Sequence, residues 1–353
     1  MSLGYYLRRR GNWKMREPMV YIIVLNWNGW RDTIECLESV FRLNYDAFRV
    51  IVCDNGSEDH SLDRIAEWAG GGLAAECSNP ELRHLSSPGC PKPIALVRVE
   101  AGEPVRWGSE RERLLLVQTG ANRGFAGGNN VGLRVALEAA DMDYVWLLNN
   151  DTVVQPDALR WMVKRMEERP DAGMCGSTLV YYRRPGAVQT LGGSVYQRWL
   201  ARTFYIGAYG DAGKLPEAAW VEARMKYVLA ASMLVRKEFL EVVGLMNESY
   251  FLYFEEIDWA SRAAGRFGMA YSPQSVVYHK EGATIGPKRS ETYSAVSVFH
   301  FIRGRVLFTR RHHPYALLPV CAAILLSAAR HRGGRGKATL RGLRDGLRQS
   351  KAG

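Results

Sequence analysis

The chain has 353 residues, of which 47% are hydrophobic and 24% are charged, so it can bury a full globular core in one large domain or two. Six cysteines are scattered without CxxC spacing, which argues against a zinc site or a disulfide framework and favours a reducing compartment. Residues 1–18 form a basic segment that lacks the apolar run of a secretory signal.

In the first half of the chain, short apolar runs alternate with helical patterns. Apolar residues recur at helical spacing after Asp32 or Thr33, after Ser61 and after a glycine-rich loop. Four runs have the length and composition of strands in a parallel sheet covered on both faces: 19–25, 48–53, 113–119 and 144–149. The alternation predicts an α/β fold with a Rossmann-like, open, mostly parallel sheet and helices on both faces.

Residues 70–110 interrupt this alternation. They contain "GGG", "SSPGCPKP" and "GEP", have no clear helical period and are too long for an ordinary connection. We expect them to form an insertion at the margin of the sheet.

Each predicted strand ends on polar residues, and in open sheets of this kind ligands bind beyond the carboxyl ends of the strands. Any one of these residues could be an ordinary turn or helix-capping residue, but four strand ends converge. In chain order, the candidates for ligand binding are Asn26 and Asn28; Asp54; Asn122, Arg123, Gly124, Gly127 and Gly128; and Asn149, Asn150 and Asp151.

The glycines of "NRGFAGGNN" differ in spacing from a dinucleotide-binding fingerprint, and they follow the third strand instead of the first. Glycines before a helix still allow the backbone to approach a phosphate or a sugar, and a helix N-terminus favours an anion. The pattern therefore predicts a phosphorylated ligand other than NAD.

The net charge of +11 lies entirely in the tail, residues 301–353, which holds 12 Lys or Arg and one acid, Asp345. Its fifteen uncharged residues, 315–329, are too few to cross a hydrocarbon core of roughly 30 Å comfortably. Three leucines behind them share one face of a predicted basic helix: Leu340, Leu343 and Leu347. This pattern predicts a helical tail on an anionic membrane surface, and a cytoplasmic protein peripheral to the inner face of the plasma membrane.

Two alternatives for the tail remain open. Residues 315–329 could be a core helix followed by a solvated basic end. Nucleic acid would use the same charge, but the tail has no aromatic residue after Tyr315 to interleave with it, so we expect no nucleic-acid partner.

Six motifs occur in order over residues 20–282: "VLNWNG", "VIVCDNGSEDHS", "NRGFAGGNNVG", "WLLNNDTVVQPDAL", "GLMNESYFLYFEEIDWASRAAGRFG" and "VVYHKEG". In this order they resemble the inverting family 2 glycosyltransferases of the GT-A fold, and within them the rhamnosyltransferase-like branch. The resemblance implies a GT-A domain over residues 19–300. It also implies transfer of a sugar from dTDP-rhamnose or a UDP-sugar to a glycolipid or polysaccharide acceptor in cell-envelope glycan synthesis.

The same resemblance implies roles for the strand-end residues. Asn26 and Asp54 would hold the nucleotide base and ribose, and the glycine-rich stretch with Asn122 would line the donor site. The sequence Asn149-Asn150-Asp151 occupies the position of the family's DxD-type metal motif. Asp151 would bind a divalent cation, Mg²⁺ or Mn²⁺, which bridges the diphosphate oxygens, with His279 as a second ligand or phosphate contact.

The acidic cluster "FLYFEEIDW" contains Glu255, Glu256 and Asp258. Inverting transfer needs a carboxylate that takes the proton of the acceptor hydroxyl. The family's motif is usually Glu-Asp at this point, and Glu256 occupies its second position, which makes Glu256 the candidate base. Alternatively, the acids stabilise a helix N-terminus through its dipole.

Two other functions remain open at this stage. A catalytically weak or inactive membrane-associated scaffold protein would keep the fold without the chemistry, and the incomplete metal motif motivates it. A nucleotidyltransferase or a dehydrogenase on a related sheet would release pyrophosphate or reduced nicotinamide. The sequence does not indicate an oligomeric state.

Overall fold

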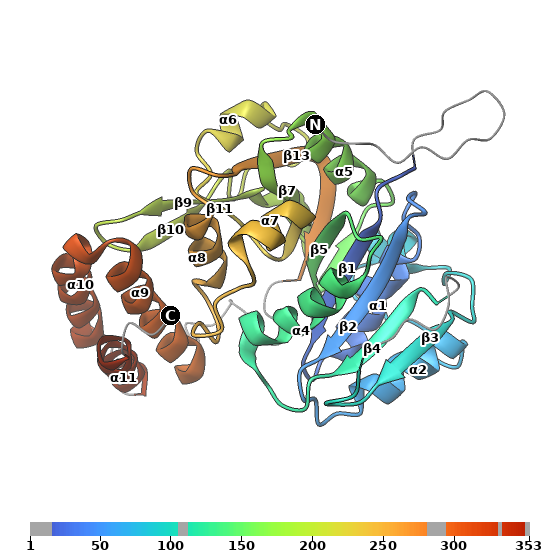
Figure 1. Ribbon diagram of the computed structural model, residues 1–353, viewed down its shortest axis with the longest axis horizontal. Helices are drawn as coiled ribbons and strands as arrows, with labels where there is room; N and C mark the ends of the chain where they lie inside the picture. Colours follow the sequence, from blue (N-terminus) through green and yellow to red (C-terminus); the bar gives the residue numbers. More distant parts are fainter. Residues whose placement is uncertain (1–15, 105–111, 281–293, 331–333, 350–353) are drawn as a thin grey trace.

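The computed structural model describes residues 16–104, 112–280, 294–330 and 334–349. One half of its central sheet is parallel, with the strand order β3-β4-β2-β1-β5 (Figure 1). The strands are β1 (Val20–Asn26), β2 (Phe48–Asp54), β3 (Leu96–Val99), β4 (Leu114–Gln118) and β5 (Tyr144–Asn149). The four strands predicted from apolar runs are confirmed, with ends within one residue of their predicted positions.

Alternate residues of the strands face two different cores, because successive side chains of a strand point to opposite faces of the sheet. On one face Ile22 packs with α1 (Trp30–Val40), α2 (Ser61–Gly70) and α5 (Ala158–Glu168). On the other face Ile23 packs with α4 (Gly124–Glu138), α7 (Lys237–Val243) and α8 (Glu255–Arg262). Helices therefore cover both faces, as the sequence predicted.

The other half of the sheet mixes strand directions and continues the order as β5-β12-β7-β13-β6, with β8 paired to β7. Its strands are β6 (Thr152–Val154), β7 (Ala172–Tyr181), β8 (Arg184–Leu191), β12 (Ser232–Arg236) and β13 (Gly268–His279). At the end of β13, His279 pairs with Thr152 of β6. This pairing brings the last strand of the sheet to the end of β5.

Smaller elements surround the sheet. A three-stranded sheet consists of β9 (Gly193–Gln197), β10 (Arg202–Tyr205) and β11 (Tyr227–Val228), and the short helix α6 (Ala218–Glu222) precedes β11. The segment that the sequence marks as an insertion contains η1 (Pro80–Leu82), α3 (Arg83–Ser86) and the edge strand β3.

The three glycines of "NRGFAGGNN" lie inside α4 and not in a loop before it, which corrects the expectation from sequence. A β-carbon on Gly128 would lie 2.5 Å from Leu25 Cδ1, and one on Gly127 would lie 2.8 Å from Arg123 Cβ. Gly124 has φ of +71° and lies against the carbonyl of Phe251. Glycine is needed at these positions because a larger side chain would clash with the neighbouring residues of the protein.

The C-terminal helices are α9 (Ala295–His312), η2 (Pro314–Ala316), α10 (Leu317–Arg330) and α11 (Gly334–Arg348). The domain boundary expected at residue 300 falls inside α9, because the expectation followed the change in charge and α9 continues across it. Residues of all three α-helices share a small core: Ile302, Val306, Val320, Ile324 and Leu343. Within the described residues, no helix combines the length and the hydropathy that a bilayer span requires.

The predicted leucine face of α11 is only partly free. Leu343 is buried, whereas Leu340 and Leu347 are exposed. Gly342 and Gly346 allow α11 to lie directly on α9: a β-carbon at Gly342 would be 2.6 Å from the carbonyl oxygen of Phe299. The described part of the tail is therefore a packed helical unit and not a solvated extension.

This close approach predicts the effect of Gly342→Ala. Alanine favours a helix over glycine by about 1 kcal/mol, but the clash with backbone should outweigh that gain and lower the free energy of unfolding by about 1–3 kcal/mol. Urea unfolding measures the change. Gly334→Ala is the matched control, because no atom lies within 4 Å of its β-carbon position. A Gly342→Ala variant as stable as wild type would contradict the close packing of α11 on α9.

Candidate active site

The first two strands of the sheet end on a buried polar pair. Asn26 Nδ2 donates to Asp54 Oδ1 at 2.7 Å, and Asn26 Oδ1 accepts from Thr33 Oγ1 at 2.7 Å. Asp54 also accepts from Ser57 and from Gln118 Nε2. Both predicted nucleotide-binding side chains are thus already hydrogen-bonded within the protein, and they hold the strand ends in one arrangement.

Asn28 lies on the exposed side of this pair, in the left-handed region with φ of 49°. Its backbone N–H donates to Ser57 Oγ at 2.8 Å, and its side-chain oxygen accepts from Glu58 N at 2.8 Å. The loops after β1 and β2 are tied together through these bonds. Asn28 is therefore a surface residue above the buried pair.

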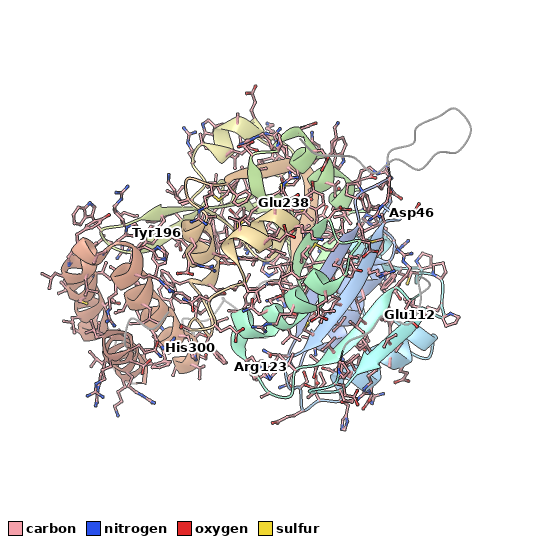
Figure 2. All side chains as sticks on the ribbon, viewed as in Figure 1. Asp46, Glu112, Arg123, Tyr196, Glu238 and His300 are labelled. Atoms are coloured by element: carbon pink, nitrogen blue, oxygen red, sulfur yellow. The ribbon has the colours of Figure 1, made fainter. Side chains whose placement is uncertain are left out.

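The third strand end is organised by Asn55. Its side chain donates to Asn122 Oδ1 and to the Gly124 carbonyl, both at 3.1 Å, and accepts from Arg123 N at 3.0 Å. Asn122 and Arg123 are exposed. Figure 2 shows Arg123 at the start of α4, on the side of the sheet that faces the C-terminal helices.

Asp151 and His279, the two predicted metal ligands, lie next to each other. Asp151 Oδ1 is 3.1 Å from His279 Nε2, and both residues are buried. His279 Nδ1 is 2.9 Å from Gln189 Oε1, and because an amide oxygen can only accept, Nδ1 carries a hydrogen. A hydrogen bond that orients a histidine in this way, with its other nitrogen beside a carboxylate, suits a divalent cation.

Asn149 and Asn150 flank this pair. Asn149 Nδ2 is 3.5 Å from His279 Nε2, while Asn150 is buried and donates to Thr33 Oγ1 at 3.1 Å. Among the described residues, no group of three His, Cys, Asp or Glu side chains could hold a metal ion. A cation here would take Asp151 and His279 from the protein and its remaining ligands from the donor and water.

The charge at Asp151 is stabilised by its neighbours. Burial alone would raise the pKa of Asp151, but His279 and the ammonium group of Lys280 outweigh burial and hold this pKa below its usual value. The backbone N–H of Lys280 also donates to the backbone carbonyl of Asp151 at 2.9 Å. The Asp151 carboxyl group is therefore ionised.

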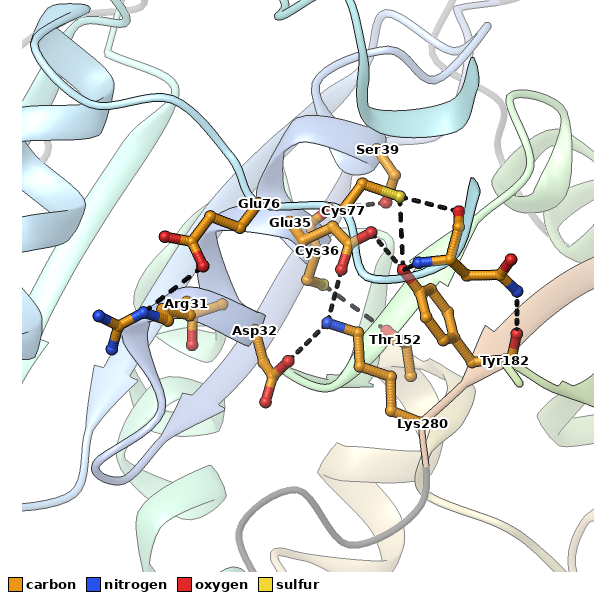
Figure 3. Close-up of polar contacts among 12 residues, drawn as sticks. Arg31, Asp32, Glu35, Cys36, Ser39, Glu76, Cys77, Thr152, Tyr182 and Lys280 are labelled. Carbon is orange, nitrogen blue, oxygen red and sulfur yellow. Dashed lines mark hydrogen bonds and ion pairs between the residues drawn. The ribbon is translucent and has the colours of Figure 1, made fainter. Parts of the chain in front are cut away.

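Lys280 itself is held by two carboxylates of α1. Its Nζ is 2.5 Å from Asp32 Oδ1 and 2.5 Å from Glu35 Oε2, and Tyr182 OH donates to Glu35 Oε1 at 2.7 Å (Figure 3). Glu35 is fully buried. This cluster fixes the end of β13 against α1.

The acidic cluster lies at the start of α8. Glu256 Oε1 accepts from Ala230 N at 2.7 Å, and burial raises the pKa of Glu256 to about 7. Glu255 is more deeply buried, and burial together with the charge of Glu256 raises its pKa well above the usual value. Tyr253 and Phe254, just before them, have φ of 69° and 71°, a strained conformation that is found most often at functional sites.

Asp258 has a different environment from the two glutamates. Its buried carboxylate is 2.8 Å from His312 Nε2 and 3.0 Å from Arg262 Nε. Burial opposes ionisation, but His312 and Arg262 outweigh it and lower the pKa of Asp258. The contact with His312 joins α8 to α9, so Asp258 is suited to positioning the helix and not to accepting a proton.

One short segment connects the metal pair to the glutamates. Asn149 N donates to the Ala231 carbonyl at 3.1 Å, and the preceding residue, Ala230, donates to Glu256. The strand end that leads to Asp151 and the carboxylate of Glu256 are thus bonded to consecutive residues. The structure brings together two motifs that lie about a hundred positions apart in the sequence.

Several residues of this site were missed by sequence reasoning. The sequence indicates Thr33 only as a candidate helix cap, and it assigns no role to Lys280, although Lys280 lies inside the motif "VVYHKEG". Gln189, Gln118 and Ala230 lie outside the ligand-binding motifs, and no pattern in their surroundings points to a polar contact with the site.

Known proteins resemble this chain in sequence or in fold. The Haloferax volcanii protein "Low-salt glycan biosynthesis hexosyltransferase Agl10" is 26% identical over 150 residues, which are 42% of this chain and 45% of that protein. The match thus spans less than half the length of this relative.

Solved structures share the fold at low sequence identity. S. aureus TarS 1-349 covers 93% of this chain and 80% of its own, with 13% identity and a TM-score of 0.51. Mannosyltransferase PcManGT from Pyrobaculum calidifontis, in complex with GDP-Man and Mn²⁺, covers 94% and 88%, with 15% identity and a TM-score of 0.50. GalNAc-T7 with UDP, GalNAc and Mn²⁺ covers 84% and 48%, with 10% identity and a TM-score of 0.56. The fold is of the GT-A type.

The family model described as "Glycosyl transferase family 2" matches residues 21–87 and 106–215, just over half of the chain. These residues include the four strand ends that lead to Asn26, Asp54, Asn122 and Asp151. The match shows that this chain is a glycosyltransferase that belongs to glycosyl transferase family 2.

Proposed function

We propose that this enzyme transfers a sugar, with inversion, from a nucleoside-diphosphate sugar to a glycolipid or polysaccharide acceptor in cell-envelope glycan synthesis. The observation that carries the proposal is the pairing of two groups across one short segment. Asp151 and His279 are suited to hold a diphosphate-bound cation, and Glu256 has a pKa suited to a general base. The carbonyl of Ala231 accepts from Asn149 N, two residues before Asp151, and the backbone N–H of Ala230 donates to Glu256.

For the donor we propose dTDP-rhamnose or a UDP-sugar. The motif resemblance to the rhamnosyltransferase-like branch supports the first, and the UDP of GalNAc-T7 supports the second. Purified protein incubated with dTDP-, UDP- and GDP-sugars and Mn²⁺ tests this choice. Release of free nucleoside diphosphate identifies the donor, whereas release of none from any of them would favour a scaffold protein without activity.

A divalent cation, Mg²⁺ or Mn²⁺, would supply positive charge to the diphosphate as the leaving group departs. Asp151 and His279 would hold it, with His279 oriented by Gln189. Glu256 takes the proton of the acceptor hydroxyl. The acceptor oxygen bonds to the anomeric carbon, and the bond from that carbon to the diphosphate breaks on the opposite face. Exposed Asn28, Asn122 and Arg123 are suited to contact the donor.

We further propose that the protein is cytoplasmic and peripheral to the inner face of the plasma membrane. The charge of the tail supports this location, because 12 basic residues and one acid would be attracted to anionic lipids. A lipid-linked acceptor would be within reach of an enzyme held at that surface.

The first prediction from the site concerns Asp151. Asp151→Asn should reduce cation-dependent transfer by more than about 100-fold, since loss of even an outer partner of a metal ligand costs about 10- to 100-fold. Initial rates against Mn²⁺ concentration, with donor binding by calorimetry, measure it. Gln189→Leu should fall in that smaller range, because it only releases the orientation of His279. Unchanged Mn²⁺ dependence in Asp151→Asn would show that the cation is held elsewhere.

A second prediction separates the glutamates. Glu256→Gln keeps the shape of the side chain and removes the proton acceptor, so kcat should fall by about 100-fold or more while donor affinity changes little. Glu255→Gln should be milder. Transfer assays and nucleoside-diphosphate binding measure both effects. If Glu255→Gln abolishes transfer and Glu256→Gln stays active, the base is Glu255.

The pH dependence of kcat gives a third test. A base must be ionised, and burial raises the pKa of Glu256 to about 7, so kcat should rise with pH through about 7. One pH unit below that pKa, about one tenth of the carboxyl groups are ionised, and kcat should be about tenfold below its plateau. A profile that stays flat from about pH 5.5 to pH 8 would exclude Glu256 as the base.

A further inference from the structure

An exposed apolar stripe runs along the outer face of α10. Five of its residues follow helical spacing, so they lie on one side of the helix: Leu318, Ala322, Leu325, Leu326 and Ala329. Exposed Tyr315, in η2, lies just before them. Leu318 is 83% exposed and Leu326 63%. The opposite side of the helix is used, because Val320 and Ile324 are fully buried against α9 and α11. Folding therefore buries one side of α10 and leaves this apolar stripe exposed.

The turn between β9 and β10 extends this stripe. Figure 1 shows the hairpin reaching from the body of the molecule toward α10. At its tip Trp199 is 55% exposed, and its ring contacts that of Tyr315 with centroids 5.3 Å apart. Arg305 of α9 donates to the Leu200 carbonyl at 3.1 Å, which fixes the tip against the tail. The combined surface, here called the α10 face, thus comes from two distant parts of the sequence.

The charged side chains at the two ends of the α10 face are positive. Exposed Arg198 precedes Trp199, and exposed Arg330 ends α10, so a cation lies at each end of the stripe. Residues 193–210 contain no acid, and the only acid of residues 294–353 is Asp345, which is paired with Arg303 at 2.6 Å. A partner for this surface must accept leucines and an indole while carrying negative charge.

We propose that the α10 face docks the enzyme on an anionic lipid bilayer. Leucine side chains enter the boundary between headgroups and acyl chains, Trp199 and Tyr315 lie at headgroup level, and the arginines contact anionic headgroups. The helix would lie flat, since its 14 residues span about 21 Å. This inference rests on the proposed membrane location but replaces the predicted leucine face of α11 as the surface that makes the contact.

The test uses the full chain and vesicles of phosphatidylglycerol and phosphatidylcholine in equal parts. Leu318→Glu with Leu325→Glu should weaken vesicle binding by on the order of tenfold or more, and binding of the wild type should weaken with added salt. Val242→Glu is the matched control, because Val242 is a similarly exposed apolar residue on α7. Vesicle co-sedimentation measures binding, and thermal unfolding verifies that each variant is folded.

Three outcomes would overturn the proposal. Release by Leu340→Glu with Leu347→Glu, but not by the α10 variant, would identify α11 as the contact. Equal binding to vesicles of phosphatidylcholine alone would remove the role of charge. Self-association of the wild type in ultracentrifugation that the α10 variant abolishes, without vesicle binding, would make the face a protein interface. Donor turnover, measured without lipid, should be unchanged in the α10 variant, so a failure here is distinct from a failure of the proposed reaction.

Discussion

A largely buried lysine joins the two halves of the sheet at the candidate active site. Lys280 ends the mixed half, at the carboxyl end of β13, and its ammonium group lies between Asp32 and Glu35 of α1, which covers the parallel half (Figure 3). Glu35 is inaccessible to solvent, and a buried charge is costly unless it is paired. The chain must therefore place Lys280 there, and His279, one residue earlier, is brought against Asp151 as a consequence.

The C-terminal helices support the other part of the site. His312 of α9 pairs with Asp258 of α8, and Phe308 of α9 packs against Phe254, one of the two aromatic residues in left-handed conformation before the glutamates. A strained backbone persists only where its surroundings hold it in place. The tail thus has two sides with different tasks: α9 supports α8, and α10 presents its free apolar face outward.

The polar residues at the strand ends divide into two groups by burial. Asn26, Asp54 and Asn150 are buried. Asn26 bonds directly to Asp54, and Thr33 bonds to both Asn26 and Asn150, so these residues make the edge of the sheet rigid. Asn28, Asn122 and Arg123 are exposed above them. Ser57 positions the first of these residues, and Asn55 positions the other two. Preorganised groups of this kind lose little freedom when a ligand binds.

Local sequence determined the parallel half of the fold and the order of the motifs. Apolar runs and helical periods specify β1, β2, β4 and β5 because a strand covered on both faces must be apolar throughout. The mixed half, from β6 to β13, was not predicted, since strands such as β8 (Arg184–Leu191) and β13 (Gly268–His279) contain polar residues, glycine and proline and have no continuous apolar run. Likewise only the tertiary structure decided that the glycines of α4 serve packing and that Asp258 belongs to an ion pair. It also decided that Gln189 orients His279 and that one side of α10 remains exposed. These features depend on contacts between residues far apart in the chain, and a local sequence pattern does not encode such contacts.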